Sequence, residues 1–113
     1  MSVPLSKVRK LGNTYYLSGE LGFSAPGVLA EGGVAGQTKQ CLENIKATLA
    51  GEGLSLDDVV TATCYLVNPS DFGAFNEVYA SYFGDPKPSR TTVGIELMLP
   101  EALVEITVIA EGK

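Results

Sequence analysis

The 113-residue sequence contains no histidine, and its eight basic residues are outnumbered by thirteen acidic ones. Without histidine the chain lacks the commonest general base and the commonest metal ligand, so we expect no metal site. A nucleic-acid-binding protein needs a concentrated positive surface, and the formal net charge of −5 argues against such a partner. Cys41 and Cys64 lie far apart in segments of apolar periodicity, which favours two buried free thiols over a disulfide.

Long hydrophobic runs are also absent, so no segment is expected to span a membrane. The first residues, Met1 to Leu5, lack the charged and then apolar pattern of a secretory signal, and we expect a cytoplasmic protein. No linker, repeat or low-complexity segment divides the chain, and its length suits one hydrophobic core. We therefore expect a single domain over residues 1–113.

Turn residues and hydrophobic periodicity predict the order of the elements. The expected order is strands 7–11 and 14–18, a loop over 22–33, a helix from Val34 to about Leu49, a strand over 59–67, a helix over 71–83, and strands over about 90–98 and 102–110. The aromatic face of the second helix is interpreted as core packing. This β-β-α-β-α-β-β order predicts an α+β fold with both helices packed on one face of a sheet.

The last two strands predict which side chains reach each face, because alternate residues of a strand point to opposite sides. The residues assigned to the helix face are Val93, Ile95, Leu97, Val104, Ile106, Val108 and Ala110. Arg90 and Glu105 are then expected together on the outer face, on neighbouring strands of an antiparallel sheet. Leu103 and Ile109 share that face, so we expect another copy of the protein to cover it.

Arg90 and Glu105 beside a subunit interface have two interpretations. They can form a structural ion pair that fixes the register. Alternatively, Arg90 binds the carboxylate of a small molecule while Glu105 handles a water molecule or a proton. Spacing alone does not distinguish the two.

Short motifs run in a fixed order from about residue 11 to residue 110. They are Ser18-Gly19-Glu20, Gln37-Thr38, Leu42-Glu43-Asn44-Ile45-Lys46, Leu56-Asp57-Asp58-Val59-Val60, Asp71-Phe72, Phe75-Asn76-Glu77-Val78-Tyr79, Tyr82-Phe83, Pro88-Ser89-Arg90-Thr91-Thr92-Val93, Leu99-Pro100 and Val104-Glu105-Ile106. In this order and spacing they resemble the Rid family, the reactive intermediate deaminases, also called the YjgF family. The resemblance implies a chorismate-mutase-like fold and a homotrimer whose sheets enclose a central barrel, with ligand sites in clefts between subunits.

The resemblance also implies an activity. RidA-like members hydrolyse reactive 2-imino and 2-enamino acids, such as 2-aminoacrylate, to 2-keto acids and ammonia without a cofactor. It implies that Arg90 pairs with the substrate carboxylate and that Glu105 positions or activates the attacking water. It further implies that Gly19, Asn76 and Thr92 line the pocket, with Thr92 at a position where the family usually has cysteine.

The tyrosine that the family carries before its first strand is absent from this chain. Its absence leaves a second hypothesis open, a non-catalytic protein that binds or senses a small carboxylate such as a keto acid. Saturable keto-acid binding without turnover of imines would favour that hypothesis. A third, the ribonuclease activity assigned to some relatives, is disfavoured by the negative net charge and the absence of histidine.

Overall fold

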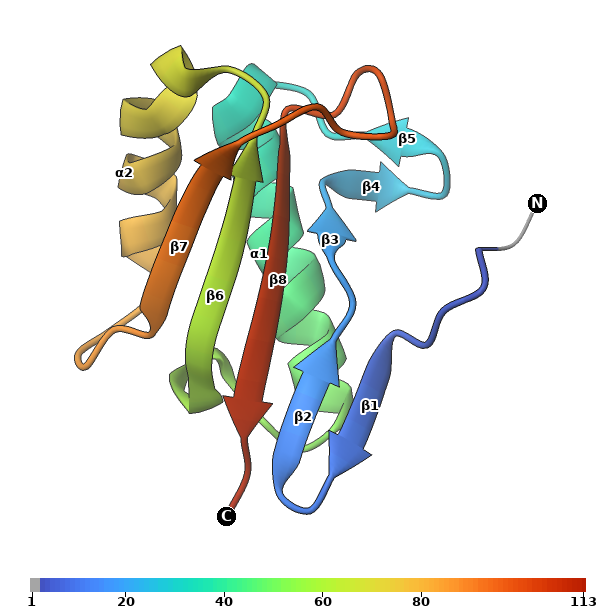
Figure 1. Ribbon diagram of the computed structural model, residues 1–113, viewed down its shortest axis with the longest axis vertical. Helices are drawn as coiled ribbons and strands as arrows, with labels where there is room; N and C mark the ends of the chain where they lie inside the picture. The colour runs from blue at the N-terminus through green and yellow to red at the C-terminus, as the bar shows by residue number, and fades with distance from the viewer. Residues whose placement is uncertain (1–2) are drawn as a thin grey trace.

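The computed structural model describes residues 3–113, in which two helices lie on one face of a sheet (Figure 1). The sheet consists of β1 (Val8–Leu11), β2 (Thr14–Leu17), β3 (Glu20–Leu21), β6 (Val59–Leu66), β7 (Ser89–Gly94) and β8 (Val104–Glu111). The helices are α1 (Gly33–Gly51) and α2 (Phe72–Tyr82). A hairpin of β4 (Phe23–Ala25) and β5 (Val28–Leu29) occupies part of the segment expected to be a loop. The predicted α+β fold, with both helices on one face, is confirmed.

Strand β8 is the centre of the sheet. It pairs antiparallel with β2, β3 and β6, whereas β6 and the edge strand β7 are parallel. The expectation of an antiparallel sheet is therefore wrong at the β7 edge, because the chain crosses over through α2 and returns in the direction of β6. The strand order β1-β2-β8-β6-β7 also places β6 between β7 and β8, so the last two strands are not neighbours.

The hydrophobic core lies between the sheet and the helices. Four residues of β8 are fully buried, as their alternation predicts: Val104, Ile106, Val108 and Ala110. The helices contribute Cys41, Leu42, Ile45, Leu49, Phe75 and Tyr79 to the same core. Both cysteines are buried free thiols, as expected. Because each large apolar side chain contributes about 1.5–3 kcal/mol on full burial, this layer holds the strands in register against the helices.

Turn residues set the ends of α1 and the start of β6. Gly53 adopts a φ of +76°, which lets the Leu54 N–H donate back to the Leu49 carbonyl at 2.8 Å and ends the helix. Ser55 and Asp58 then form a capping box, in which the Ser55 N–H donates to the Asp58 carboxylate at 2.9 Å. In the described chain, residues 3–113, neither α1 nor any other helix combines the length and apolarity needed to cross a membrane.

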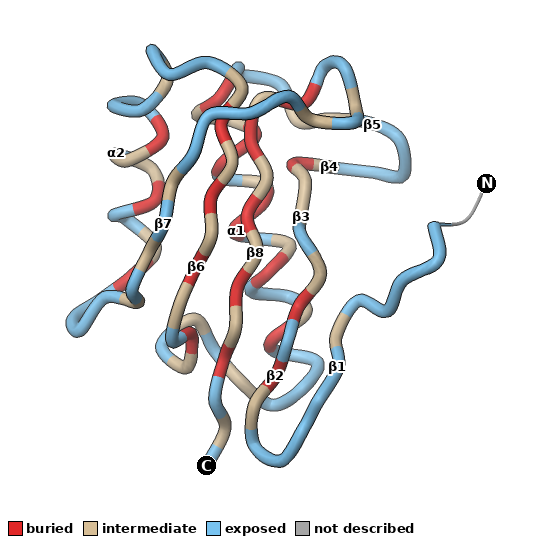
Figure 2. The backbone as a smooth tube through the Cα atoms, viewed as in Figure 1, coloured by how far each residue is buried: buried red, intermediate tan, exposed pale blue. Residues whose placement is uncertain are grey.

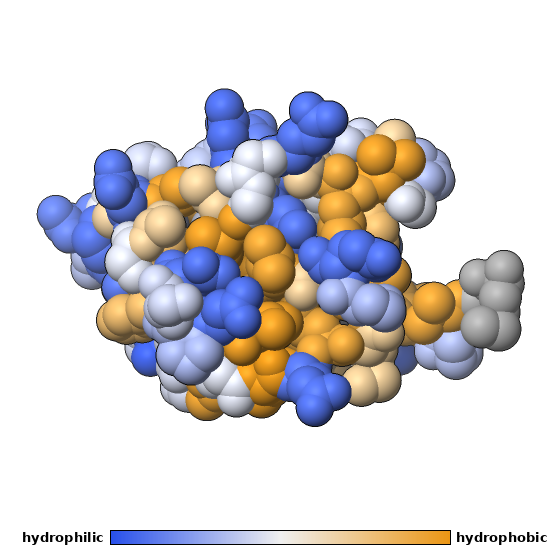
Figure 3. Space-filling view, turned by 90° about the horizontal axis from the view of Figure 1, so that it is seen from above, coloured by the Kyte–Doolittle hydropathy of each residue, from blue (hydrophilic) through white to orange (hydrophobic). Residues whose placement is uncertain are grey.

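The other face of the sheet is not covered by any element of residues 3–113 (Figures 1 and 2). Along β8, half-buried residues alternate with the buried ones, and Tyr16 of β2 is 45% exposed. Seen from the end at which β6 and β7 terminate, apolar side chains also lie at the surface between hydrophilic ones (Figure 3). Exposed apolar residues of β7 and the segment after it include Val93, Ile95 and Met98. An outer face with this much apolar surface is typical of a face that contacts another molecule.

Candidate active site

Arg90 lies on the helix face of the sheet, not on the outer face predicted for it. In the parallel pairing of β6 and β7, Arg90 is opposite Ala62 and Thr92 is opposite Cys64. Ala62 and Cys64 are buried in the core, and paired residues on adjacent strands point to the same side. Val93, which the sequence assigned to the core, is instead 39% exposed. The alternation predicted for this strand is therefore wrong by one residue.

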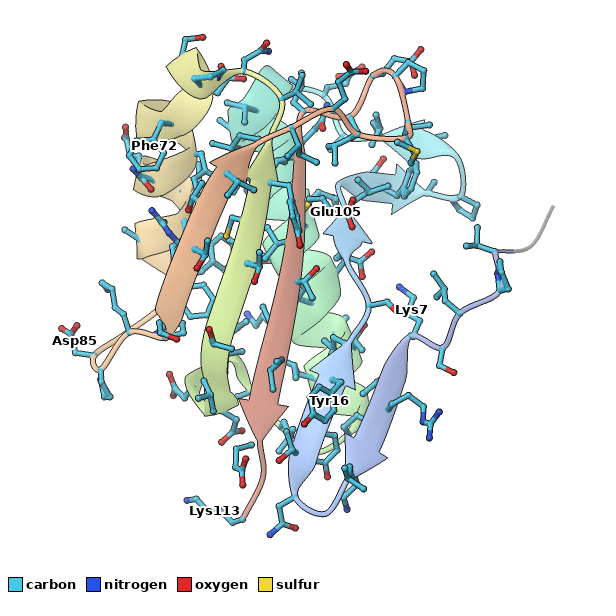
Figure 4. The ribbon with its side chains drawn as sticks, in the orientation of Figure 1. Lys7, Tyr16, Phe72, Asp85, Glu105 and Lys113 are labelled. Atoms are coloured by element: carbon cyan, nitrogen blue, oxygen red, sulfur yellow. The ribbon has the colours of Figure 1, made fainter. Side chains whose placement is uncertain are left out.

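Glu105 lies on the outer face, as predicted. It stands between Val104 and Ile106, which are buried against the helices, and Tyr65 of β6 is opposite it. Figure 4 shows the Glu105 side chain on the side of the sheet away from the helices. Within one chain, Arg90 and Glu105 therefore point to opposite sides of the sheet, and the expectation that they open onto one face is wrong.

The guanidinium of Arg90 lies among three aromatic rings of α2. Its Cζ atom is 4.8 Å from the ring centre of Tyr79, 5.3 Å from that of Phe75 and 5.8 Å from that of Phe72. Within residues 3–113, no carboxylate forms an ion pair with it. The charge of Arg90 is therefore stabilised by ring faces and not neutralised by an acidic side chain of the described chain.

Arg90 lines an open pocket of about 340 Å³ between α2 and β7. The other lining residues are Asn76, Tyr79, Ala80, Lys87 and Pro88. Asn76 Oδ1, Tyr79 Oη and Thr92 Oγ1 are buried and form no hydrogen bond with residues 3–113. A buried polar group without a partner costs about 1–3 kcal/mol, so this side of the sheet holds three polar atoms whose hydrogen-bonding capacity residues 3–113 leave unused.

Gly19 and Glu105 form a second group on the outer face. A Cβ atom at Gly19 would collide with the Glu105 carboxylate and would lie 3.1 Å from Thr107 Oγ1. The carboxylate therefore occupies the space over Gly19 that a side chain would fill. Burial, and then the charge of Glu20, raises the pKa of Glu105. A half-buried carboxyl group whose pKa is raised by burial holds a proton more readily than an exposed one, which suits a group that accepts and returns a proton.

The five predicted site residues thus form two groups. Arg90, Asn76 and Thr92 belong to the α2–β7 side of the sheet, while Gly19 and Glu105 belong to its outer face. Within residues 3–113, no three Cys, Asp or Glu side chains are close enough together to hold a metal ion.

Gln37 is named from the sequence only as part of a motif and is given no role there, whereas in the structure it fixes the chain just before Glu105. Its Nε2 donates to the Glu101 carbonyl at 3.2 Å, and its Oε1 accepts from the Leu103 N–H at 2.8 Å. These bonds hold the entry to β8 against α1. A buried glutamine between Val34 and Cys41, at the spacing of the core residues of α1, is the signal that could have identified it.

A second missed feature is the ion pair between Lys7 and Glu20, at 3.2 Å. Glu20 is in β3, directly after Gly19, and its charge is one of the two causes of the raised pKa of Glu105. Residues thirteen positions apart carry no local signal of contact. Lys7 comes near Glu20 because the β1–β2 pairing continues to the Ser18 N–H, which donates to the Lys7 carbonyl at 3.1 Å.

Comparisons with known proteins identify relatives of this chain. The sequence model described as "Endoribonuclease L-PSP" matches residues 1–112. A RutC family protein of Pyrococcus horikoshii is 42% identical over 108 residues, which cover 95% of this chain and 86% of that protein. A 2-iminobutanoate/2-iminopropanoate deaminase of the mite Dermatophagoides farinae is 35% identical over 104 residues, which cover 91% of this chain and 81% of that protein.

A solved structure is similar over nearly the whole chain. The crystal structure of RidA from an Antarctic Psychrobacter species has a TM-score of 0.90 and 38% sequence identity, and the match covers 98% of this chain and 90% of that one. The family model, the two relatives and the solved structure each match nearly the whole chain. The chain therefore belongs to the Rid family, also called the YjgF family.

Proposed function

We propose that the chain is a hydrolytic deaminase that converts reactive 2-imino and 2-enamino acids, such as 2-aminoacrylate, to 2-keto acids and ammonia. The observation that carries the proposal is Glu105, a half-buried carboxyl group with a raised pKa that is packed over Gly19. The relative named 2-iminobutanoate/2-iminopropanoate deaminase supports the same reaction class.

The active site is proposed to form between protomers of a homotrimer. Arg90 is on the edge strand β7, and the outer face of the sheet carries exposed apolar side chains. If the β7 edge of one protomer lies beside the outer face of the next, Arg90 approaches Glu105 of the partner subunit. A ligand in that cleft would also reach Asn76, whose buried Oδ1 forms no hydrogen bond with residues 3–113.

In this cleft Arg90 binds the substrate carboxylate bidentately. Water adds to the iminium carbon, the C–O bond forms while the C=N electrons move to nitrogen, and Glu105 of the partner subunit accepts the water proton. Glu105 of the partner subunit then returns that proton to nitrogen. The C–N bond breaks with its electron pair on ammonia, and ammonia takes up the hydroxyl proton as the keto group forms. An enamine enters the same route after protonation at Cβ.

A protonated imine is already electrophilic, so this reaction requires neither a covalent nucleophile nor a cofactor. Holding the carboxylate and the water in attack geometry, together with one proton-transfer group, supplies the acceleration. The proposed reaction therefore does not need histidine, which the sequence lacks.

Subunit complementation tests the proposal. Arg90→Ala and Glu105→Gln should each abolish deaminase activity, because removing one side of a closed carboxylate contact costs about 2–5 kcal/mol and losing the proton-transfer group costs about 10²–10⁴ in rate. The activity is the rate at which the protein removes the imine absorbance formed by an amino-acid oxidase. An equimolar mixture of the two variants, refolded together, should recover activity.

The expected recovery follows from counting the interfaces of a cyclic assembly. An intact site takes Arg90 from one variant and Glu105 from the other, so about one quarter of the sites are intact in a random mixture. No recovery, with mixed oligomers shown by mass spectrometry, would refute the composite site. Binding of 2-oxobutanoate without turnover of any imine would support the non-catalytic alternative instead.

The description of the family model names an endoribonuclease, but the charge of this chain does not support an RNA substrate. Eight basic residues against thirteen acidic ones provide little positive surface to exchange for the counterions of RNA. We propose no nucleic-acid partner for the site.

A further inference from the structure

The aromatic residues of α2 have a role that core packing does not explain. Phe75 and Tyr79 are buried, but Phe72 is 47% exposed and contributes little to the core. All three rings nevertheless surround the same guanidinium, within 5.8 Å of Arg90 Cζ. On β6 the residue opposite Arg90 is Ala62, which has a small side chain.

We infer that the aromatic face of α2, formed by Phe72, Phe75 and Tyr79, is a positioning element that holds Arg90 ready for an anionic substrate. The inference rests on the proposed function of Arg90 and adds residues that act through it. The three aromatic residues are positioning residues that act through Arg90, and Tyr79 in addition lines the pocket beside it.

Aromatic rings suit this task better than an acidic partner does. A carboxylate beside Arg90 would fix the side chain, but it would occupy the N–H donors and compete with the substrate carboxylate. A ring face attracts the cation through its quadrupole and leaves the charge available. The structure has this arrangement, because within residues 3–113 no carboxylate forms an ion pair with Arg90.

The ring that can be changed without disturbing the core is Phe72. Replacing it with mono-, di- and trifluorinated phenylalanines removes negative potential from the ring face step by step while its size hardly changes. The Kd for 2-oxobutanoate and the KM for a 2-imino acid should both rise in steps, by about twofold to fivefold over the series, while kcat stays constant. The neutral amide of 2-oxobutanoate, which has no carboxylate for Arg90, should bind equally weakly to every member.

The matched control is the same fluorinated series at Phe23, in β4, which should leave both constants unchanged. A graded rise at Phe72 alone supports the inference, because a merely structural role would not follow ring electronics. Constants that do not change along the Phe72 series, or that change equally for the amide, would overturn it. If the unsubstituted protein binds no 2-oxobutanoate and turns over no imine, the proposed function itself fails, and this inference fails with it.

Discussion

Replacing Gly19 with alanine tests directly whether Glu105 works from the position seen in the structure. The new methyl carbon would lie 2.9 Å from the carboxyl carbon of Glu105, too close for that contact to persist, and 3.1 Å from Thr107 Oγ1, a tight contact that a small shift relieves. The backbone at Gly19 does not need to move, because the end of the Glu105 side chain can rotate away. Gly19→Ala should therefore displace the carboxyl group and leave the fold intact.

The expected loss of activity is set by the role of that carboxyl group. A positioned general acid or base contributes about 10²–10⁴ to the rate, so kcat should fall at least about 100-fold, close to the level of Glu105→Gln. KM should change little, because the substrate carboxylate is bound by Arg90 and not by Glu105 in the proposed site. Stability should change by less than about 1 kcal/mol. Burial disfavours the charged form of Glu105 and raises its pKa, so outward rotation of the charged group relieves that penalty.

The assay is the rate of imine hydrolysis, measured beside thermal unfolding. The matched control is Gly51→Ala, at the end of α1, where a Cβ atom meets nothing within 4 Å. That variant should keep full activity and become slightly more stable, because alanine is a better helix former than glycine. Combining Gly19→Ala with Glu105→Gln should cost no more activity than either change alone. Full activity of Gly19→Ala, or a further loss in the double variant, would refute the role given to this contact.

Two further changes test the electrostatics and the scaffold. Because the pKa of Glu105 is raised, the folded chain binds its proton more tightly than the unfolded chain, so this stabilisation is complete at low pH and is lost as the pH rises through the raised pKa. Urea unfolding should therefore show wild type losing stability relative to Glu105→Gln over that window, and parallel profiles would show that Glu105 is not perturbed. Gln37→Leu leaves the Leu103 N–H and the Glu101 carbonyl without their partner, and Tm should fall by roughly 5–15 °C. An unchanged Tm in calorimetry would show that these two bonds do not hold the entry to β8.

Much of the fold could be predicted, because several helices and strands each have one clear feature in the sequence, such as apolar alternation or a glycine at the end of a helix. In β8 the four buried positions are all apolar, and of the residues that alternate with them only Ile109 is apolar. The end of α1 follows from Gly53, whose φ of +76° suits glycine best. Such local signals do not determine which strands pair. The parallel pairing of β6 with β7, and the insertion of β8 between β6 and β2, depend on contacts between distant residues.

The alternation of β7 could not be predicted, because its two faces do not differ in the usual way. β7 is an edge strand, and its helix side meets the aromatic face of α2, where a guanidinium is stabilised by ring faces. On the outer side Val93 is exposed in the single chain. A rule that places apolar residues toward the core therefore exchanges the two faces of this strand. The aromatic residues of α2 were a signal for Arg90, but only the pairing of β7 with β6 shows that they meet.

The opposite orientations of Arg90 and Glu105 determine what kind of site the chain can form. On one face of neighbouring strands, a guanidinium and a carboxylate would pair with each other, and each would compete with the substrate for its partner. In this fold β6 separates their strands and the sheet separates their side chains, so neither neutralises the other within a protomer. In the proposed trimer they approach only across a cleft between copies, the place proposed above for the substrate. The separation that contradicts the simple alternation argument is thus what keeps both charged groups available for a ligand.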